Sequence, residues 1–198
     1  MTGRPHHRPM TPGDGFFADI VGGADPARVR EAGDLAATVL VRGARDSDDP
    51  AVAERIVHLA ENEGLETLAE VWSGAPADTL AGSLWRLFLL RSWVHADPDR
   101  VAAEYDAGQR RADVARVVAG VADPPGPDEL RRMVDDVLRG IARGDFAVTL
   151  FRAAAFARIV AAGRATLGVA SHEEISRMLA LSEQLESAGH GEITDTLA

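Results

Sequence analysis

Three arginines are the residues of this sequence whose type and setting point most directly to chemistry. Arg152, Arg158 and Arg164 lie in the stretch from Phe146 to Leu167, which is strongly apolar and contains no acid. Their six-residue spacing sends them to three sides of a helix, so at least one is expected to point inward. A guanidinium offers paired N–H donors that match a carboxylate or a phosphate. We therefore treat all three as candidate ligand-binding residues, with Arg158 as the first choice for an anion pocket between helices.

The same three arginines also have a purely structural interpretation. Acids such as Asp135 and Asp136 of the preceding helix are available to pair with them. Alternatively, the aliphatic part of an arginine side chain can pack on apolar surface while its guanidinium stays in water. The two interpretations predict different results for the substitution Arg158→Ala. Loss of ligand binding with the helices intact would indicate a pocket, and unfolding would indicate a structural ion pair.

A second cluster has the residue types of a metal site. Glu54, His58 and Glu61 lie on one face of a helix predicted between Pro50 and about Asn62. Helical carboxylate sites use Glu-x-x-His pairs from two helices, and this sequence contains no Glu-x-x-His. The three residues also lie opposite the apolar side of their helix, so we expect a solvated polar face and no bound metal. The chain has no cysteine, which excludes disulfides and cysteine-ligated metals.

Signatures of the common enzyme classes are missing from the sequence. A P-loop needs a lysine, and all 21 basic residues here are arginine. Neither G-x-G-x-x-G nor G-x-S-x-G occurs, so the sequence predicts no cofactor and favours a protein without catalytic activity. A net charge of −10 repels phosphate backbones, and nucleic acid is therefore not an expected partner. The lysine-free, alanine-rich composition is typical of a bacterial genome of high GC content.

Two tryptophans, a phenylalanine and five leucines lie in the stretch LAGSLWRLFLLRSWVHADP at 80–98. This apolar surface must be buried in the core or covered by a partner. Trp85, Leu89 and Trp93 share one side of a helix, and several leucines with Phe88 occupy the other. A helix that is apolar nearly all round is usually buried, which makes core packing the first interpretation. The alternative is that Trp85, Leu89 and Trp93 form an interface for a second copy of the chain or for another protein.

The sequence carries no signal for a membrane. No segment approaches about 18 uninterrupted apolar residues, and residues 1–15 lack the apolar run of a secretory signal. In the aromatic stretch, Arg86 and Arg91 would lie near the middle of a bilayer, at a cost of roughly 2.5–3.5 kcal/mol each. We expect a cytoplasmic protein.

Local start signals place the helices that carry these residues. Asp followed by Pro, which caps free amides and opens the first turn, occurs at 25–26, 49–50 and 97–98, and Ser171 with Glu174 forms a capping-box pattern. No alternating stretch is long enough for a sheet. The expected fold is all-α, a multi-helix bundle or short helical array of seven to nine helices.

The two most apolar helices, at about 77–95 and 146–167, are expected to form the centre of this fold and to pack on each other. Gly163 and the alanines around it would let a neighbouring helix approach closely. The length of 198 residues suits one domain. Residues 1–15 read as a disordered or extended tail, residues 16–189 as the helical domain and residues 190–198 as a flexible C-terminal tail.

These observations favour a soluble, non-catalytic protein–protein interaction or scaffold domain, as a homodimer or in complex with another protein. Two alternatives stay open. One is a ligand-responsive transcriptional regulator of the all-helical type, which would need a basic surface. The other is a small-molecule-binding protein or enzyme with an arginine and acid pocket between helices, which would need polar groups that converge.

Overall fold

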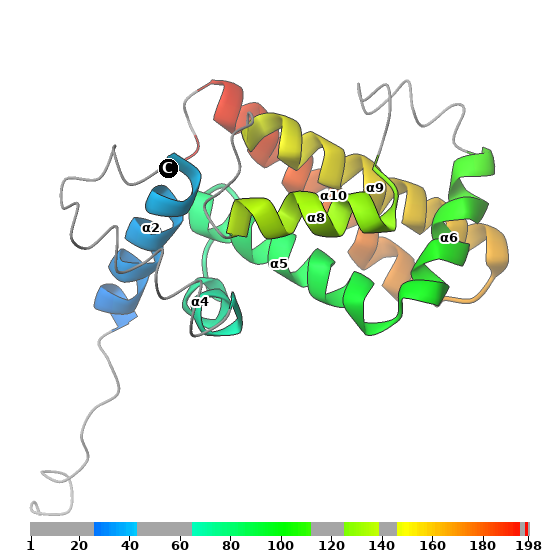
Figure 1. Ribbon diagram of the computed structural model, residues 1–198. Coiled ribbons are helices and arrows are strands. Elements are labelled where there is room, and N and C mark those ends of the chain that lie inside the picture. The colour runs from blue at the N-terminus through cyan, green and yellow to red at the C-terminus, as the bar shows by residue number, and fades with distance from the viewer. Residues whose placement is uncertain (1–25, 43–64, 112–124, 139–145, 195–196, 198) are drawn as a thin grey trace, which may run out of the picture.

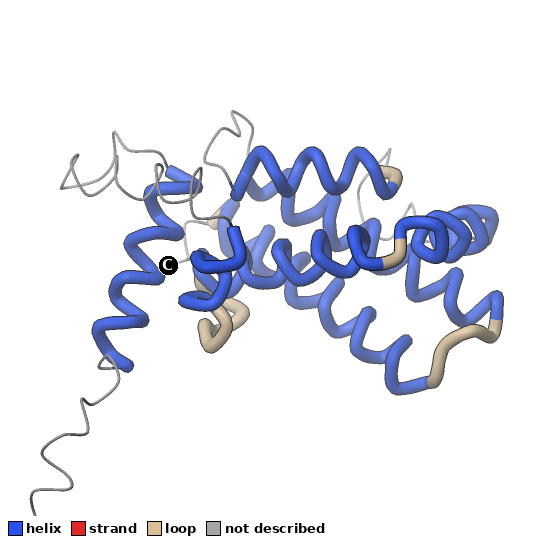
Figure 2. The backbone as a smooth tube through the Cα atoms, turned by 60° about the horizontal axis from the view of Figure 1, so that its bottom comes forward, coloured by secondary structure: helices blue, strands red, loops and turns tan. Residues whose placement is uncertain are grey.

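The computed structural model describes residues 26–42, 65–111, 125–138, 146–194 and 197, and these residues form helices joined by turns (Figure 1). The seven helices are α2 (Pro26–Arg42), α4 (Leu65–Trp72), α5 (Leu80–Ala96), α6 (Pro98–Arg111), α8 (Pro127–Leu138), α9 (Phe146–Leu167) and α10 (His172–Ile193). Figure 2 shows no strand among the described residues. The predicted all-α bundle is confirmed, and the upper end of the predicted range, nine helices, exceeds the seven that the described residues form.

Predicted start signals explain where two of these helices begin. α6 starts at Pro98 directly after Asp97, whose Oδ1 accepts a hydrogen bond from the backbone N of Arg100 at 3.2 Å. α10 starts after Ser171, and the capping box with Glu174 is present in both directions. Each signal works through hydrogen bonds within three residues of the helix start, which is why the sequence alone could place it.

α9 lies at the centre of the bundle and forms an antiparallel pair with α10. The two helices are joined by a turn at 168–171 and run side by side in Figure 1. The hydroxyl of Ser182 donates a hydrogen bond to the carbonyl oxygen of Ala154 at 2.9 Å, and the rings of Phe151 and His190 meet edge to face at 5.0 Å. Most residues of α9 are buried, so this helix supplies a large part of the core.

α9 is also the helix of the described residues that is long and apolar enough to cross a membrane. In the structure, 67% of its most apolar window is buried against the rest of the protein. That burial is what a core helix of a globular domain shows, because the neighbouring helices cover the apolar surface that lipid would otherwise cover.

α6 packs on another side of α9 at backbone contact distance. A Cβ atom on Gly163 would lie 1.7 Å from the carbonyl oxygen of Glu104, and one on Gly108 would lie 1.9 Å from a carbonyl oxygen of α9. Glycine is required at both positions because a side chain there would force the two helices apart. The rings of Tyr105 and Phe156 stack beside this contact with centroids 5.4 Å apart.

The two apolar helices that the sequence placed at the centre are both part of the core, but they meet over a short stretch only. The main neighbours of α9 are α10 and α6, and those of α5 are α2, α8 and α4. The close approach at Gly163 explains why α9 and α5 have so little contact. At this glycine α6 packs on one side of α9, and α10 covers a second side. Only a small part of the surface of α9 is then left to contact α5.

The C-terminal end of the chain is held against the bundle. α10 continues to Ile193, so the first residues of the predicted C-terminal tail are helical. Arg42 of α2 donates two hydrogen bonds to the carboxylate of Glu192, and Leu197 is buried. The predicted N-terminal tail at 1–15 lies outside the described residues.

α5 crosses the bundle with one side only partly covered: Leu89 is exposed there, and Trp85, Phe88 and Trp93 are partly buried against the core. Its inner side contributes the fully buried Leu84 and Leu87. On one flank Arg91 pairs with Asp135 of α8. On the other flank the Nε of Arg86 donates to the amide oxygen of Gln184 on α10 at 2.7 Å. The partly covered side between these flanks includes Trp85, Leu89 and Trp93, which the sequence nominated.

Candidate functional site

The three candidate arginines of α9 reach three different helices. Arg152 pairs with Glu129 of α8. The Nη2 atom of Arg158 lies 2.5 Å from Oε2 of Glu186 on α10, and the Nε atom of Arg164 lies 2.9 Å from Oε2 of Glu104 on α6. The arginines therefore do not converge on one pocket.

The acids that these arginines use differ from the two that the sequence analysis named. Asp135 forms its ion pair with Arg91 of α5, and the side chain of Asp136 lies outside the described set. The partners come instead from α6, α8 and α10, up to 60 residues away along the chain. The prediction that the three arginines pair with acids is thus confirmed. The two acids named as their partners were wrong, because tertiary packing selects the partner.

Arg164 belongs to a cluster of three charged residues, in which Glu104 and Arg164 are buried and Arg100 is exposed. Glu104 is the centre of this cluster, with a side chain that is 1% exposed. Its Oε1 accepts a hydrogen bond from Arg100 at 3.0 Å and its Oε2 accepts one from Arg164 at 2.9 Å. Both carboxylate oxygens are thereby paired, as a buried charge requires.

The guanidinium of Arg164 also lies over an aromatic ring. Its Cζ atom is 4.6 Å from the centre of the Trp93 indole of α5, a geometry that gives a cation–π attraction. The sequence analysis had placed Trp93 in an interface set and Arg164 in a ligand set. The fold brings these two sets together, because the end of α9 passes beside the end of α5.

Next to this contact is a groove with a volume of 340 Å³ between α5 and α10. It is lined by Leu89, Leu90, Trp93, Arg100, Arg164, Glu174, Arg177, Met178 and Leu181. Leu89 is 42% exposed at its edge, whereas the side chain of Arg164 is 6% exposed at its base. We refer to these lining residues as the α5–α10 groove.

Glu174 gives the groove a carboxylate whose position is fixed. Its side chain accepts hydrogen bonds from the backbone N and the hydroxyl of Ser171, both at 2.8 Å. The backbone and hydroxyl bonds to Ser171 lower the pKa of Glu174, and the nearby positive charges of Arg164 and Arg100 lower it further. The carboxylate is therefore ionised at neutral pH.

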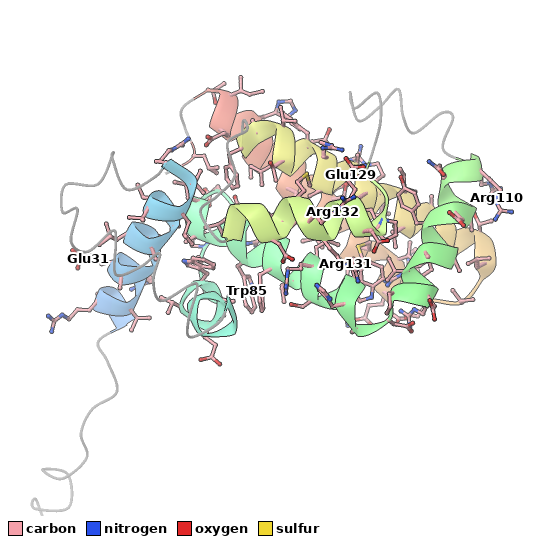
Figure 3. All side chains as sticks on the ribbon, viewed as in Figure 1. Glu31, Trp85, Arg110, Glu129, Arg131 and Arg132 are labelled. Atoms are coloured by element: carbon pink, nitrogen blue, oxygen red, sulfur yellow. The ribbon has the colours of Figure 1, made fainter. Side chains whose placement is uncertain are left out.

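The aromatic side of α5 continues from this groove. The rings of Trp85 and Phe88 stack with centroids 5.8 Å apart, and Trp85 projects from α5 at the edge of the bundle (Figure 3). Of the predicted interface residues, Leu89 is exposed, while Trp85 and Trp93 are half-buried. Phe88, which the sequence analysis placed on the opposite side of the helix, is half-buried and lies beside Trp85, so we call Trp85, Phe88, Leu89 and Trp93 the α5 face.

Two larger hollows lie elsewhere on the described part of the molecule. One, of 640 Å³, lies between α2, α4 and the turn that follows α4. The other, of 530 Å³, lies between the end of α6 and the end of α9 and includes Arg110 and Arg111. The α5–α10 groove is smaller than both, but it combines a buried cation, an indole and one exposed apolar side chain, that of Leu89.

The metal candidates Glu54, His58 and Glu61 lie outside the described residues. Within the described ranges, no group of three or more histidine and acidic side chains is arranged to hold a metal ion. In the same ranges, every buried side-chain nitrogen or oxygen atom has a hydrogen-bond partner.

Of the residues of this site, sequence analysis nominated only Leu89, Trp93 and Arg164. It missed Leu90, Arg100, Glu104, Glu174, Arg177, Met178 and Leu181. A signal for Glu104 was present, because it shares the helical spacing of Val101, Tyr105 and Gly108 and so falls within an apolar stripe. An acid in such a stripe needs a buried cation as its partner. No comparable signal marks Arg177, which enters the groove only through the packing of α10 on α5.

A comparison of this chain with protein-family models, with curated proteins and with solved structures finds no match.

Proposed function

We propose that this protein is a cytoplasmic, non-catalytic protein–protein interaction domain and that the α5 face is its docking surface. The observation that supports the proposal is the exposure of Leu89, at 42%, between aromatic residues on a helix whose other side forms the core. The four residues of the face, Trp85, Phe88, Leu89 and Trp93, follow one another along a single rigid helix.

The chemistry of the α5 face suits an interface. Tryptophan and phenylalanine present large contact areas and lose little conformational entropy when a partner covers them. Trp85 is already ordered by stacking on Phe88, and Trp93 by the guanidinium of Arg164. A partner that covers them would therefore gain apolar burial without having to order these side chains.

A second copy of the chain is the first partner to test, because self-association needs no other component. In a symmetric dimer the α5 face of one copy would contact the same face of the other. Another protein with an apolar helix or segment would use the same residues.

Photo-crosslinking from within the face tests this function. A benzophenone amino acid replaces Leu89 in one variant and Val148 of α9 in a matched control, since both positions are exposed apolar residues within helices. We expect an adduct from position 89 alone, to a second copy in the purified protein or to one defined protein in cells. Equal or absent crosslinking from the two positions in both experiments would refute the proposal.

A further inference from the structure

We propose that the α5 face binds a second copy of itself with the two α5 helices antiparallel. The two-fold axis then passes between the two Leu89 side chains, and Trp85 of each copy lies at the α5–α10 groove of the other. This inference rests on the proposed function, because it uses the same docking face. It goes further by naming the partner and the way in which the two helices meet.

The spacing of the α5 face is the first argument. Trp85 lies four residues before Leu89 and Trp93 lies four residues after it, so both are about 6 Å from Leu89 along the helix, in opposite directions. A two-fold axis at Leu89 and perpendicular to α5 exchanges these directions, which brings Trp85 of each copy to Trp93 of the other. Leu89 is also the most exposed residue of the face, at 42%, as a residue that contacts its own copy must be.

The shape of the two ends of this face is the second argument. At one end, the α5–α10 groove has a volume of 340 Å³, and Met178 and Leu181 line it beside the indole of Trp93. At the other end, the indole of Trp85 projects from α5 at the edge of the bundle (Figure 3). The axis at Leu89 brings the two ends together, so the groove of one copy receives the projecting ring of the other. Each chain thus carries both halves of the contact, which is what a two-fold interface requires.

The charges beside the face are the third argument, because each cation there has an acid near it. The three arginines that line the groove are accompanied by three carboxylates, those of Glu104, Glu173 and Glu174. Arg91 pairs with Asp135 on one flank of α5. On the other flank burial lowers the pKa of Arg86, and the nearby charge of Asp78 opposes this shift. These balanced sets add nothing to the net charge of −10, so two copies repel each other less at this face than at the acidic surface that carries the excess.

The direction of the two helices is the fourth argument. In an antiparallel pair, the N-terminus of each α5 lies beside the C-terminus of the other, so the opposite ends of the two helix dipoles attract. In a parallel pair, like ends would meet, and Trp93 of one copy would face Trp93 of the other. The guanidinium of Arg164 over each of these rings would then lie close to its own copy. The antiparallel arrangement avoids this contact between like charges.

Single cysteines in the full-length protein test the arrangement, because the chain contains no cysteine of its own. In Leu89→Cys the two thiols lie across the axis from each other, and mild oxidation should give a disulfide-linked dimer. In Asp78→Cys a nitroxide spin label on each copy reports the direction of the helices by double electron–electron resonance. The two labels should be at least roughly 27 Å apart, because antiparallel packing separates the two Leu80 starts of α5 by twice nine residues of helix.

An acidic substitution with a matched control then tests the affinity. Leu89→Asp places two carboxylates next to each other at the axis and should raise the dissociation constant of the dimer about 100-fold or more in sedimentation velocity experiments. Val148→Asp introduces the same charge at an exposed apolar residue of α9, and it should leave the dissociation constant unchanged.

Three results would overturn the inference. If the purified protein is monomeric while a benzophenone at position 89 captures one defined protein in cells, then the proposed function stands and the partner is not a second copy. If a dimer forms and Leu89→Asp leaves it intact, then the two copies meet elsewhere. If the labels at position 78 are as close to each other as labels at position 89, then the helices are parallel and the assigned contact between Trp85 and the groove is wrong.

Discussion

Replacement of Gly163 by alanine is expected to destabilise the protein, although the same change in an exposed helix is normally favourable. The new Cβ would lie 1.7 Å from the carbonyl oxygen of Glu104, whereas ordinary contact begins at 3.4 Å. The backbones of α6 and α9 must therefore separate by about 1.7 Å at this point, the difference between these distances. Because the obstacle is backbone, no rotation of a side chain can relieve it.

The size of the effect follows from two opposing terms. Overpacking of a close contact costs about 1–3 kcal/mol, and a clash with backbone belongs at the upper end. Alanine regains about 0.5–1 kcal/mol of helix propensity over glycine. The balance is a loss of about 2 kcal/mol in the free energy of unfolding, which corresponds to a fall in Tm of roughly 4–8 °C for a protein of this size.

Urea denaturation followed by far-UV circular dichroism measures this loss. Gly74→Ala is the control, because Gly74 lies in the turn after α4 and nothing lies within 4 Å of the position that its Cβ would occupy, and it should change stability by less than about 0.5 kcal/mol. The m-value should stay the same in both variants, since the surface exposed on unfolding is unchanged. If Gly163→Ala is as stable as the wild type or more stable, then α6 and α9 do not meet at backbone contact and the account of this packing is wrong.

Three further predictions concern the charged residues. Glu104→Gln leaves the buried guanidinium of Arg164 without its carboxylate and should lower the free energy of unfolding by about 3–5 kcal/mol in urea denaturation, while a loss below about 1 kcal/mol would show that the pair is dispensable. Arg158→Ala breaks the half-buried pair with Glu186, which is too weak to unfold the protein in the way the sequence analysis linked to a structural pair; it should lower the free energy of unfolding by about 1 kcal/mol or less with helical content retained, and a loss above about 3 kcal/mol would contradict this account. Ser171→Ala removes the hydroxyl bond to Glu174 but keeps the backbone N–H bond that is the main cause of its lowered pKa, so an NMR titration should show this pKa rising only part of the way towards the ordinary value of about 4.3. In the wild type the stabilisation from the ionised carboxylate is present above that ordinary value and is lost as the pH falls through the lower folded pKa, so a capping contribution that persists in stronger acid would refute this assignment.

The sequence by itself determined the helices and several of their ends. Two helix starts depend on hydrogen bonds to neighbouring backbone atoms, at Asp97 with Pro98 and at Ser171 with Glu174. A few consecutive residues are therefore enough to predict them. The apolar character of 146–167 likewise predicted a buried helix, because burial of that surface is favourable whichever neighbour supplies the cover. The prediction that Gly163 admits a close neighbour is confirmed for the same reason, since the absence of a Cβ is a property of the residue itself.

Only the tertiary structure decided which helix meets which. Arg164 could have paired with any acid that the fold brought near it, and the backbone contact at Gly163 brings Glu104 rather than an acid of α8. The same packing brings Trp93 into contact with Arg164. A predicted interface residue and a predicted ligand-binding residue therefore line the same groove. An ion pair or a cation–π contact depends on a separation of a few ångströms between residues far apart in the chain. Helical periodicity fixes the side of a helix on which a residue lies, but it does not specify what packs against that side.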